Sequence, residues 1–351
     1  MTTDDEVAER LYNDPKAEEV TGQGQFWKAL GAEHAEALEA HGFDAVKRVQ
    51  ALRYFTWRWG ARRALLGHQG RYVLTHTKPA TWLRAALSPV NLSPDAWAPA
   101  SWSRGERWLY AVATRLIWEI ARRYGSRRTL DLAEPMLGSP FPIRWRGRLI
   151  SQDLANTALE MASIEEALAG SRPEHVLEIG AGYGRTAHAI LSIYPEAAYT
   201  IVDIRPAIDI SRWYLTTLFP DRDLTFIDGT DPGASPRPFD LAVSISSLQE
   251  MTREVVDRYL HMLDRDARSG AVVYLKQWFR WWNAVDEIEQ TIDDYEFSPR
   301  WRRLFRRRAR IQTAFAEVAF QAAGPREEER SVWVAAAVRE AAQARSDTGA
   351  P

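Results

Sequence analysis

The sequence contains no cysteine. This absence excludes disulfide bonds, thiol catalysis and cysteine metal sites, and it leaves no redox evidence about the cellular compartment. Long apolar runs are also lacking, since none approaches the roughly 18 residues that a transmembrane helix needs. Residues 1–15 are too acidic and polar for a signal peptide. We therefore expect a cytoplasmic protein with no membrane partner.

An excess of charge of one sign is missing as well. The 351 residues include 45 basic and 47 acidic side chains, which gives a net charge of −2. This balance provides no global attraction to nucleic acid or to an anionic membrane, and neither is expected as a partner. Tryptophan, in contrast, occurs 15 times, which indicates an aromatic-rich core or a pocket with apolar walls. The oligomeric state is left open.

One stretch, residues 174–203, has the order strand, glycine loop, helix, strand, acid. An apolar run over 176–179 ends in a loop with glycines at 180, 182 and 184. Apolar residues at helical spacing follow, and a second apolar run over 199–202 ends in Asp203. This order is half of a nucleotide-binding α/β unit.

The chain before this stretch is expected to be mainly helical. Helical spacing is clear over 103–124, whereas four prolines restrict 78–103 to loop with short helices. The segment 134–160 starts extended, and Ser151 is expected to cap a helix that carries Asp153 in its first turn. We place a domain junction in this segment.

Strands and helices alternate after residue 174, which predicts a mostly parallel sheet with helices on both faces. Further strands are expected at 224–227, 241–245 and 271–275, with helices at 206–219 and from Thr252 onward. Two late apolar runs, 314–320 and 332–338, are expected to pair as a closing hairpin. The predicted fold class is α/β and Rossmann-like. The predicted domains are a helical lid over 1–150, a cofactor-binding domain over 151–340 and a disordered tail over 341–351.

The glycine loop departs from the dinucleotide-binding fingerprint in two ways. That fingerprint places its third glycine at 185, where this chain has Arg185 and offers Gly184 instead. Glu178 stands two residues before the first glycine, where its charge would repel a pyrophosphate. A carboxylate suits an ammonium or a sulfonium group, so S-adenosylmethionine fits. Asp203 is placed to accept from both ribose hydroxyls, and Asp228 from the adenine amino group.

These motifs together resemble class I S-adenosylmethionine-dependent methyltransferases over about residues 174–340. Four segments, 134–160, 178–187, 244–251 and 274–278, are similar to a family of sugar O-methyltransferases. The resemblance implies a seven-stranded sheet, S-adenosylmethionine as cofactor and a sugar-containing small molecule as acceptor. The residues expected at the cofactor are Glu178, Gly180, Ala181, Gly182, Tyr183, Asp203, Ile204, Asp228, Gly229 and Ser246.

Methyl transfer is an in-line displacement at a sulfonium carbon, and a hydroxyl acceptor needs a base more than an amine does. We hypothesise that Glu250 orients or deprotonates the acceptor, with Gln249 beside it. Glu250 suits the start of the next helix equally well. Acceptor contacts are expected from Gln152, Asp153, Lys276, Gln277 and Trp278. The alternatives are a solvated strand end for Lys276 and Gln277 and a simple first-turn charge for Asp153.

Two charge blocks follow, with six acids in 286–296 and seven arginines in 300–310. The favoured interpretation is a solvated helix face of arginines paired with the acids. Alternatively, the acids attract a cationic amino sugar, or the arginines face a sugar-nucleotide diphosphate. No metal site is predicted. Transfer to a sugar hydroxyl is preferred over transfer to the nitrogen of an amino sugar. A dinucleotide-dependent oxidoreductase and a non-catalytic cofactor-fold protein are the other hypotheses.

Overall fold

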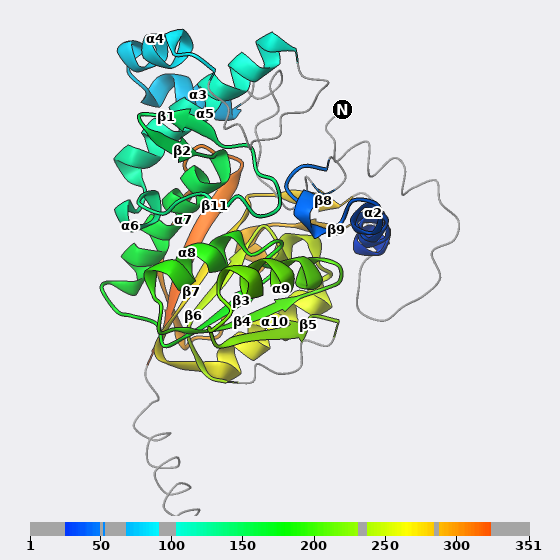
Figure 1. Cartoon of the computed structure of the whole chain (residues 1–351). Coiled ribbons are helices and arrows are strands. Elements are labelled where there is room, and N and C mark those ends of the chain that lie inside the picture. The colour runs from blue at the N-terminus through cyan, green and yellow to red at the C-terminus, as the bar shows by residue number, and fades with distance from the viewer. Residues whose placement is uncertain are drawn as a thin grey trace, which may run out of the picture.

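The computed structural model describes residues 25–49, 52, 68–90, 103–230, 237–283 and 288–323. Its centre is a seven-stranded sheet with the order β10-β11-β7-β6-β3-β4-β5 (Figure 1). Neighbours among β3 to β7 run parallel, whereas β11 is antiparallel to β7 and β10 to β11. The strands are β3 (His175–Ile179), β4 (Ala198–Asp203), β5 (Leu224–Asp228), β6 (Phe239–Ile245), β7 (Ala267–Trp278), β10 (Trp301–Arg308) and β11 (Phe315–Ala322). The predicted α/β, Rossmann-like fold is confirmed.

Helices cover both faces of this sheet, as the continuous apolar runs of β3, β4 and β6 require. One face packs against α7 (Gln152–Leu168), α8 (Arg185–Ile193) and α9 (Ala207–Leu218). The other face packs against α10 (Arg253–Asp266) and the segment that contains the turn η4 (Ile292–Asp294). Side chains alternate along each strand, so the apolar ones are divided between these two cores. Packing on both faces holds the sheet in place, and with it the loops at the ends of its strands.

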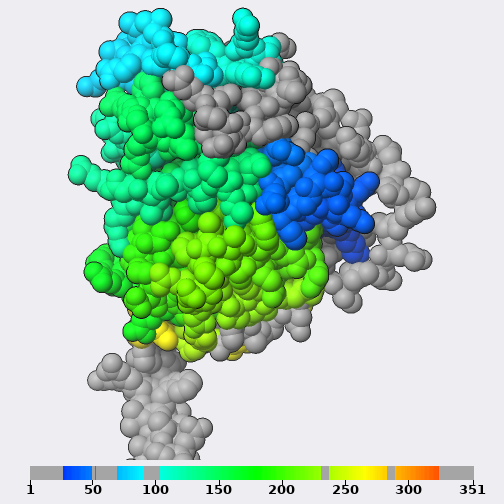
Figure 2. Space-filling model, viewed as in Figure 1, coloured from blue at the N-terminus to red at the C-terminus, as the bar shows by residue number. Residues whose placement is uncertain are grey.

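The chain before the sheet is mainly helical in its described part, as predicted. It contains α2 (Gln25–His41), η1 (Phe43–Ala45), α3 (His68–His76), α4 (Pro79–Leu87), α5 (Arg104–Tyr124), α6 (Arg127–Leu130) and the hairpin of β1 (Ile143–Trp145) and β2 (Arg148–Ile150). Ser103 and Glu106 form a capping box that starts α5. Figure 2 shows residues 25–49 in blue against the green α/β part of the molecule, and Val46 joins the sheet core there.

Helix α7 belongs to two cores at once. Its first half, with Leu154 and Ala158, packs with α5, and its second half, with Met161 and Ile164, packs on the sheet. Ser151 caps α7 as predicted, because its side chain accepts from the backbone N–H of Leu154. Within the described residues, no helix combines the length and apolar character needed to cross a membrane. The domain boundary near residue 150 remains a prediction.

Near the C-terminal end, the structure corrects the predicted hairpin partner, the predicted helix face of arginines and the bounds of the strand predicted at 271–275. The closing hairpin pairs β10 with β11, so the arginine-rich segment is a strand and not a helix face. The second predicted run, 332–338, and the predicted tail, 341–351, lie outside the described residues. Strand β7 starts at Ala267 and includes Lys276, Gln277 and Trp278. Arginines suit β10 because it is an edge strand, where charge prevents pairing with another chain.

Candidate functional site

The glycine loop joins β3 to α8 at the carboxyl edge of the sheet. Gly180, Gly182 and Gly184 have φ angles of 76°, 59° and 93°, which side chains rarely adopt. An ideal Cβ on Gly180 would lie 2.0 Å from Oγ and 2.3 Å from Cβ of Ser247. Only glycine therefore allows the segment after β6 to approach the loop this closely.

Asp203 ties the end of β4 to this loop. Its Oδ2 accepts from Gly182 N at 2.9 Å and its Oδ1 accepts from Ile204 N at 2.8 Å. Burial raises the pKa of Asp203 to about 7, although these backbone N–H groups oppose the shift. Each carboxylate oxygen can accept more than one hydrogen bond, so Asp203 can hold the loop and bind ligand hydroxyls together.

Glu178 is buried at the end of β3, with 2% of its surface exposed. Tyr199 donates its hydroxyl to Glu178 Oε2 at 2.7 Å. Burial raises the pKa of Glu178 to about 7 and the charge of Asp203 adds to this, whereas the Tyr199 bond and the Arg185 charge oppose it. Both acids thus have raised pKa values. This favours a cationic ligand, whose charge would stabilise the two carboxylates.

The other predicted cofactor residues lie along the same edge. Asp228 ends β5, opposite Asp203 in the register, and its exposed carboxylate accepts from Thr230 N at 3.0 Å. Gly229 donates its N–H to the Asp203 carbonyl at 2.9 Å. Ser246 follows β6 with a φ of 57°, a strained conformation that often occurs at functional sites. Their contact with a cofactor remains a prediction.

The side chain of Tyr183 points away from this edge and is buried. Its hydroxyl donates to Asp153 Oδ2 at 3.2 Å, and its ring packs edge-on against Tyr214 at 5.2 Å. Lys47 Nζ lies 4.6 Å from the Tyr183 ring centroid and 3.2 Å from Glu134 Oε1. These contacts anchor the loop through Tyr183, and a role of Tyr183 in cofactor binding remains a prediction.

Gln152 and Asp153 are buried in the first turn of α7. Gln152 Nε2 donates to Thr114 Oγ1 of α5 at 3.0 Å, and Asp153 accepts from Tyr183. Both side chains thus connect α7 to its neighbours, so Asp153 is more than a first-turn charge. Whether either contacts an acceptor remains untested.

The turn η3 (Leu248–Glu250) follows the carboxyl end of β6. Gln249 donates to Ser246 Oγ at 3.1 Å and accepts from Trp278 N at 2.7 Å. Gln277 accepts from Ser247 N at 3.2 Å. These two amides fix the turn, and Glu250 is buried at its end with 3% exposure. Glu250 precedes the cap of α10, Thr252.

Lys276 is not at a solvated strand end, because only 2% of it is exposed. Its Nζ lies 2.7 Å from Glu160 Oε1, and Arg185 Nη1 lies 2.5 Å from Glu160 Oε2. Glu160 therefore holds the buried Lys276 and the partly buried Arg185 between α7, α8 and β7. The charges of Arg185 and Lys276 lower the pKa of Glu160 in spite of its burial.

Sequence reasoning missed Lys47, Glu134 and Glu160. A signal existed only for Glu160, which is a lone acid within the otherwise uncharged run from Leu154 to Ile164. Such a residue on a buried helix needs an ion partner. Lys47 and Glu134 are 87 residues apart, and nothing local marks either of them.

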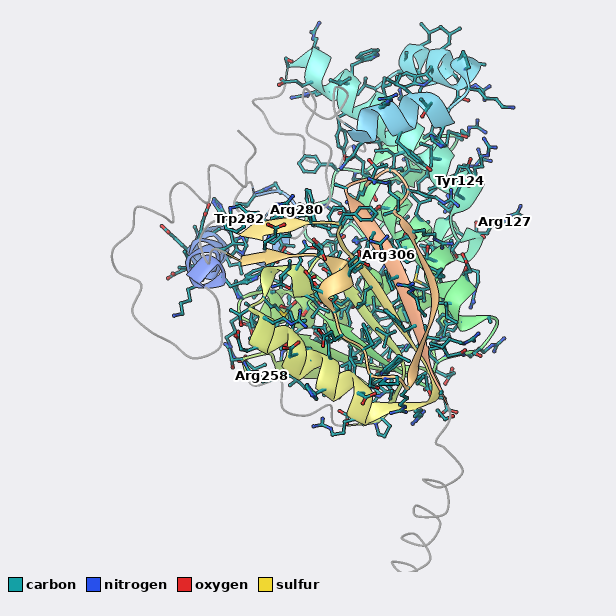
Figure 3. The ribbon with its side chains drawn as sticks, turned by 180° about the vertical axis from the view of Figure 1, so that it is seen from behind. Tyr124, Arg127, Arg258, Arg280, Trp282 and Arg306 are labelled. Atoms are coloured by element: carbon teal, nitrogen blue, oxygen red, sulfur yellow. The ribbon has the colours of Figure 1, made fainter. Side chains whose placement is uncertain are left out.

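The two charge blocks pair only in part. Arg306 of β10, labelled in Figure 3, donates to Asp293 at 2.8 Å. Arg307 instead pairs with Glu166 and Glu317, at 2.8 and 3.1 Å. Asp286 and Glu287 lie outside the described residues. Among the residues that are described, no group of three His, Asp or Glu side chains is arranged to hold a metal ion.

Comparisons with known proteins concern the fold. The sequence matches no protein-family model and no curated protein. The 1,6-didemethyltoxoflavin-N1-methyltransferase of Burkholderia thailandensis is 16% identical, over 48% of this chain and 79% of that one, with a TM-score of 0.37. The plantazolicin methyltransferase BpumL is 11% identical, over 47% and 81%, and the cyclase SpnF is 13% identical, over 48% and 82%, both with TM-scores of 0.37. The first two were solved with S-adenosylhomocysteine.

Proposed function

We propose that this chain is an S-adenosylmethionine-dependent methyltransferase that acts on a hydroxyl of a sugar or of a glycosylated small molecule. One observation carries the proposal. The buried carboxylate of Glu178 and the carboxylate of Asp203 stand beside a glycine loop at the carboxyl ends of parallel strands. This edge is where such sheets bind ligands, and its acids favour a ligand with positive charge.

A dinucleotide fits this arrangement poorly. Phosphates need free N–H groups and cations at the helix N-terminus, but Arg185 at the start of α8 is engaged by Glu160 and Thr157. Glu178 would face a pyrophosphate with a like charge. S-adenosylmethionine suits both acids better. Its amino-acid part offers an ammonium group, and the ribose of its adenosine offers two hydroxyls to Asp203.

The bound cofactor would supply an electrophilic methyl group. Residues of the chain then hold and orient the reactants: Gly180 lets the loop and Ser247 meet, and Gln249 fixes the turn beside them. Glu250 is the candidate that accepts the proton from an acceptor hydroxyl. A positioned base of this kind matters more for a hydroxyl than for a neutral amine.

Oxygen is favoured over the nitrogen of an amino sugar because the described acids of the 286–296 block are already engaged. Glu289 pairs with Arg280 and Asp293 with Arg306. Asp294 accepts from Thr291 N at 2.7 Å in a capping box. An arginine therefore offsets the charge of Glu289 and of Asp293, the two acids of the block with close arginine partners.

Calorimetric titration of the full chain with S-adenosylhomocysteine and with NAD tests the cofactor. We expect micromolar binding of S-adenosylhomocysteine and no comparable binding of NAD. Glu178→Gln should weaken the binding by at least about tenfold, or 1.4 kcal/mol. Glu174→Gln, an exposed acid just before the same strand, serves as the control and should change nothing. Tighter binding of NAD, or equal affinity in Glu178→Gln, would contradict the proposal.

A further inference from the structure

Several buried polar atoms lack a hydrogen-bond partner among the residues that the structure describes. Three of them, Trp281 Nε1, Gln290 Oε1 and Tyr295 Oη, come from one part of the chain. Gln290 and Tyr295 are only 4% and 7% exposed. Buried polar atoms are nearly always hydrogen-bonded in folded proteins, so a group of such exceptions needs an explanation.

All three side chains adjoin the same short segment, residues 248–251. Trp281 of β8 (Trp281–Asn283) stands opposite Gln290 of β9 (Ile288–Gln290) in the hairpin register, which brings the two side chains close on one face. Gln290 Nε2 donates to the Met251 carbonyl. Tyr295 interacts electrostatically with Glu250. The hairpin is marked by Arg280 and Trp282 in Figure 3.

This segment continues directly from the cofactor edge. Ser247, which immediately precedes η3, contacts Gly180 of the glycine loop. Trp278 N donates to Gln249, and the Trp278 ring lies 5.4 Å from that of Trp281. These contacts connect the glycine loop through η3 to the hairpin, and Tyr295 interacts electrostatically with the candidate base Glu250.

The chemistry of the group suits a neutral ligand with several hydroxyls. Trp281 offers a donor, Gln290 an acceptor and Tyr295 both. Burial raises the pKa of Tyr295, and nearby negative charges raise it further, so its hydroxyl keeps the proton that it can donate. The ring of Trp278 contacts the rings of Trp281 and Phe315, and these rings provide apolar surface of the kind that covers C–H groups.

A phosphorylated or cationic ligand fits less well. The nearby cations Arg280 and Arg306 are paired with Glu289 and Asp293, so a phosphate would have to displace a carboxylate from an arginine. Glu289 and Asp293 are engaged by the same pairs, so an amine would have to displace an arginine from either of them. Alternating donors and acceptors next to aromatic rings match a pyranoside.

We propose that Trp281, Gln290 and Tyr295 form a subsite that binds the hydroxyl groups of a neutral pyranoside acceptor beside the methyl-transfer position. This inference rests on the proposed function and names the residues that would select its substrate.

The test uses saturation-transfer difference NMR on the full chain, with and without S-adenosylhomocysteine. The probe is a mixture of the methyl pyranosides of glucose, galactose and mannose. We expect saturation of at least one pyranoside by the wild-type protein. Tyr295→Phe and Trp281→Phe should each weaken its apparent affinity by about three- to tenfold, the usual value of one neutral hydrogen bond. Neither variant should weaken S-adenosylhomocysteine binding.

Thermal unfolding separates this role from a structural one. Tyr295→Phe removes a hydroxyl that bonds no described residue, so the Tm should stay equal or rise. The control Tyr110→Phe removes a hydroxyl that donates to the Phe141 carbonyl at 2.8 Å, so it should lower the Tm and leave pyranoside binding intact. Absence of pyranoside saturation, or unchanged affinity in both subsite variants, would overturn the inference. If pyranosides bind as expected but S-adenosylhomocysteine does not, the proposed cofactor fails and the subsite stands.

Discussion

Replacing Lys47 by methionine tests how strongly the N-terminal segment is fixed to the glycine loop. Lys47 is 2% exposed, and its Nζ lies 3.2 Å from Glu134 Oε1 and 3.1 Å from the hydroxyl of Tyr214. It also lies 4.6 and 4.7 Å from the ring centroids of Tyr183 and Tyr214. Nearby negative charge raises the pKa of Lys47 in spite of its burial, so methionine keeps the length and removes a full charge.

The expected cost follows from these contacts. Removing one partner of a buried ion pair costs about 3–5 kcal/mol, because the other charge stays buried. The two ring contacts add about 1 kcal/mol or more, and the methionine side chain recovers part of the packing. We therefore expect Lys47→Met to lower the free energy of unfolding by about 4 kcal/mol. Glu134 keeps a hydrogen bond from Ser151 at 2.5 Å, which limits the loss.

Urea unfolding followed by tryptophan fluorescence measures this free energy. The double variant Lys47→Met/Glu134→Gln should cost about 3 kcal/mol less than the sum of its single variants, because the orphaned charge is removed. Lys78→Met changes an exposed lysine and should stay within about 0.5 kcal/mol of wild type. A loss below about 1 kcal/mol for Lys47→Met, or additive single variants, would refute the reasoning.

Three further predictions concern the site. Gly180→Ala should abolish measurable S-adenosylhomocysteine binding and lower the Tm, because its Cβ would overlap Ser247; calorimetry and thermal unfolding check this, and normal binding would contradict it. The pKa of Glu178 rises from 4.5 to about 7 on folding, so the folded protein binds the extra proton and its stability should fall by up to about 3 kcal/mol as pH rises through that window. Asp203, whose pKa burial also raises to about 7, contributes to the same window. Urea unfolding across this pH range should therefore show a smaller but not abolished slope in Glu178→Gln, and an unchanged slope would exclude Glu178 as a source. Glu250→Gln should reduce turnover by about 100-fold or more without changing S-adenosylhomocysteine affinity, and near-normal turnover would return Glu250 to a structural role.

The part of the site that could be predicted is local in the sequence. The order from β3 through the glycine loop to Asp203 needs only a strand, a turn that requires glycine and an amphipathic helix, all within 174–203. The confirmed sheet follows from repeating such units, because parallel strands bring their carboxyl ends to one edge. The placement of the glycine loop at the carboxyl ends of the parallel strands could therefore be predicted from the sequence, whereas the order of the strands was not.

The contacts that hold this edge could not be predicted, because they join distant residues. Lys47 and Tyr214 are 167 residues apart, and Lys276 and Glu160 are 116 apart. Sequence reasoning therefore assigned Lys276 to an acceptor or to solvent and overlooked its ion pair. The prediction of a helix face for the arginine block was wrong for another reason. Seven arginines in eleven positions carry almost no apolar periodicity, so a helix face and an edge strand looked alike.

The most direct test of the account is methyl transfer itself. The full chain is incubated with S-adenosylmethionine labelled with ¹³C at its methyl group and with the methyl pyranosides of glucose, galactose, mannose and glucosamine. We predict a ¹³C signal of a methyl ether on a neutral pyranoside, lost in Gly180→Ala and weakened in Tyr295→Phe. A signal confined to the nitrogen of glucosamine, or no transferred methyl although S-adenosylmethionine binds, would contradict the account.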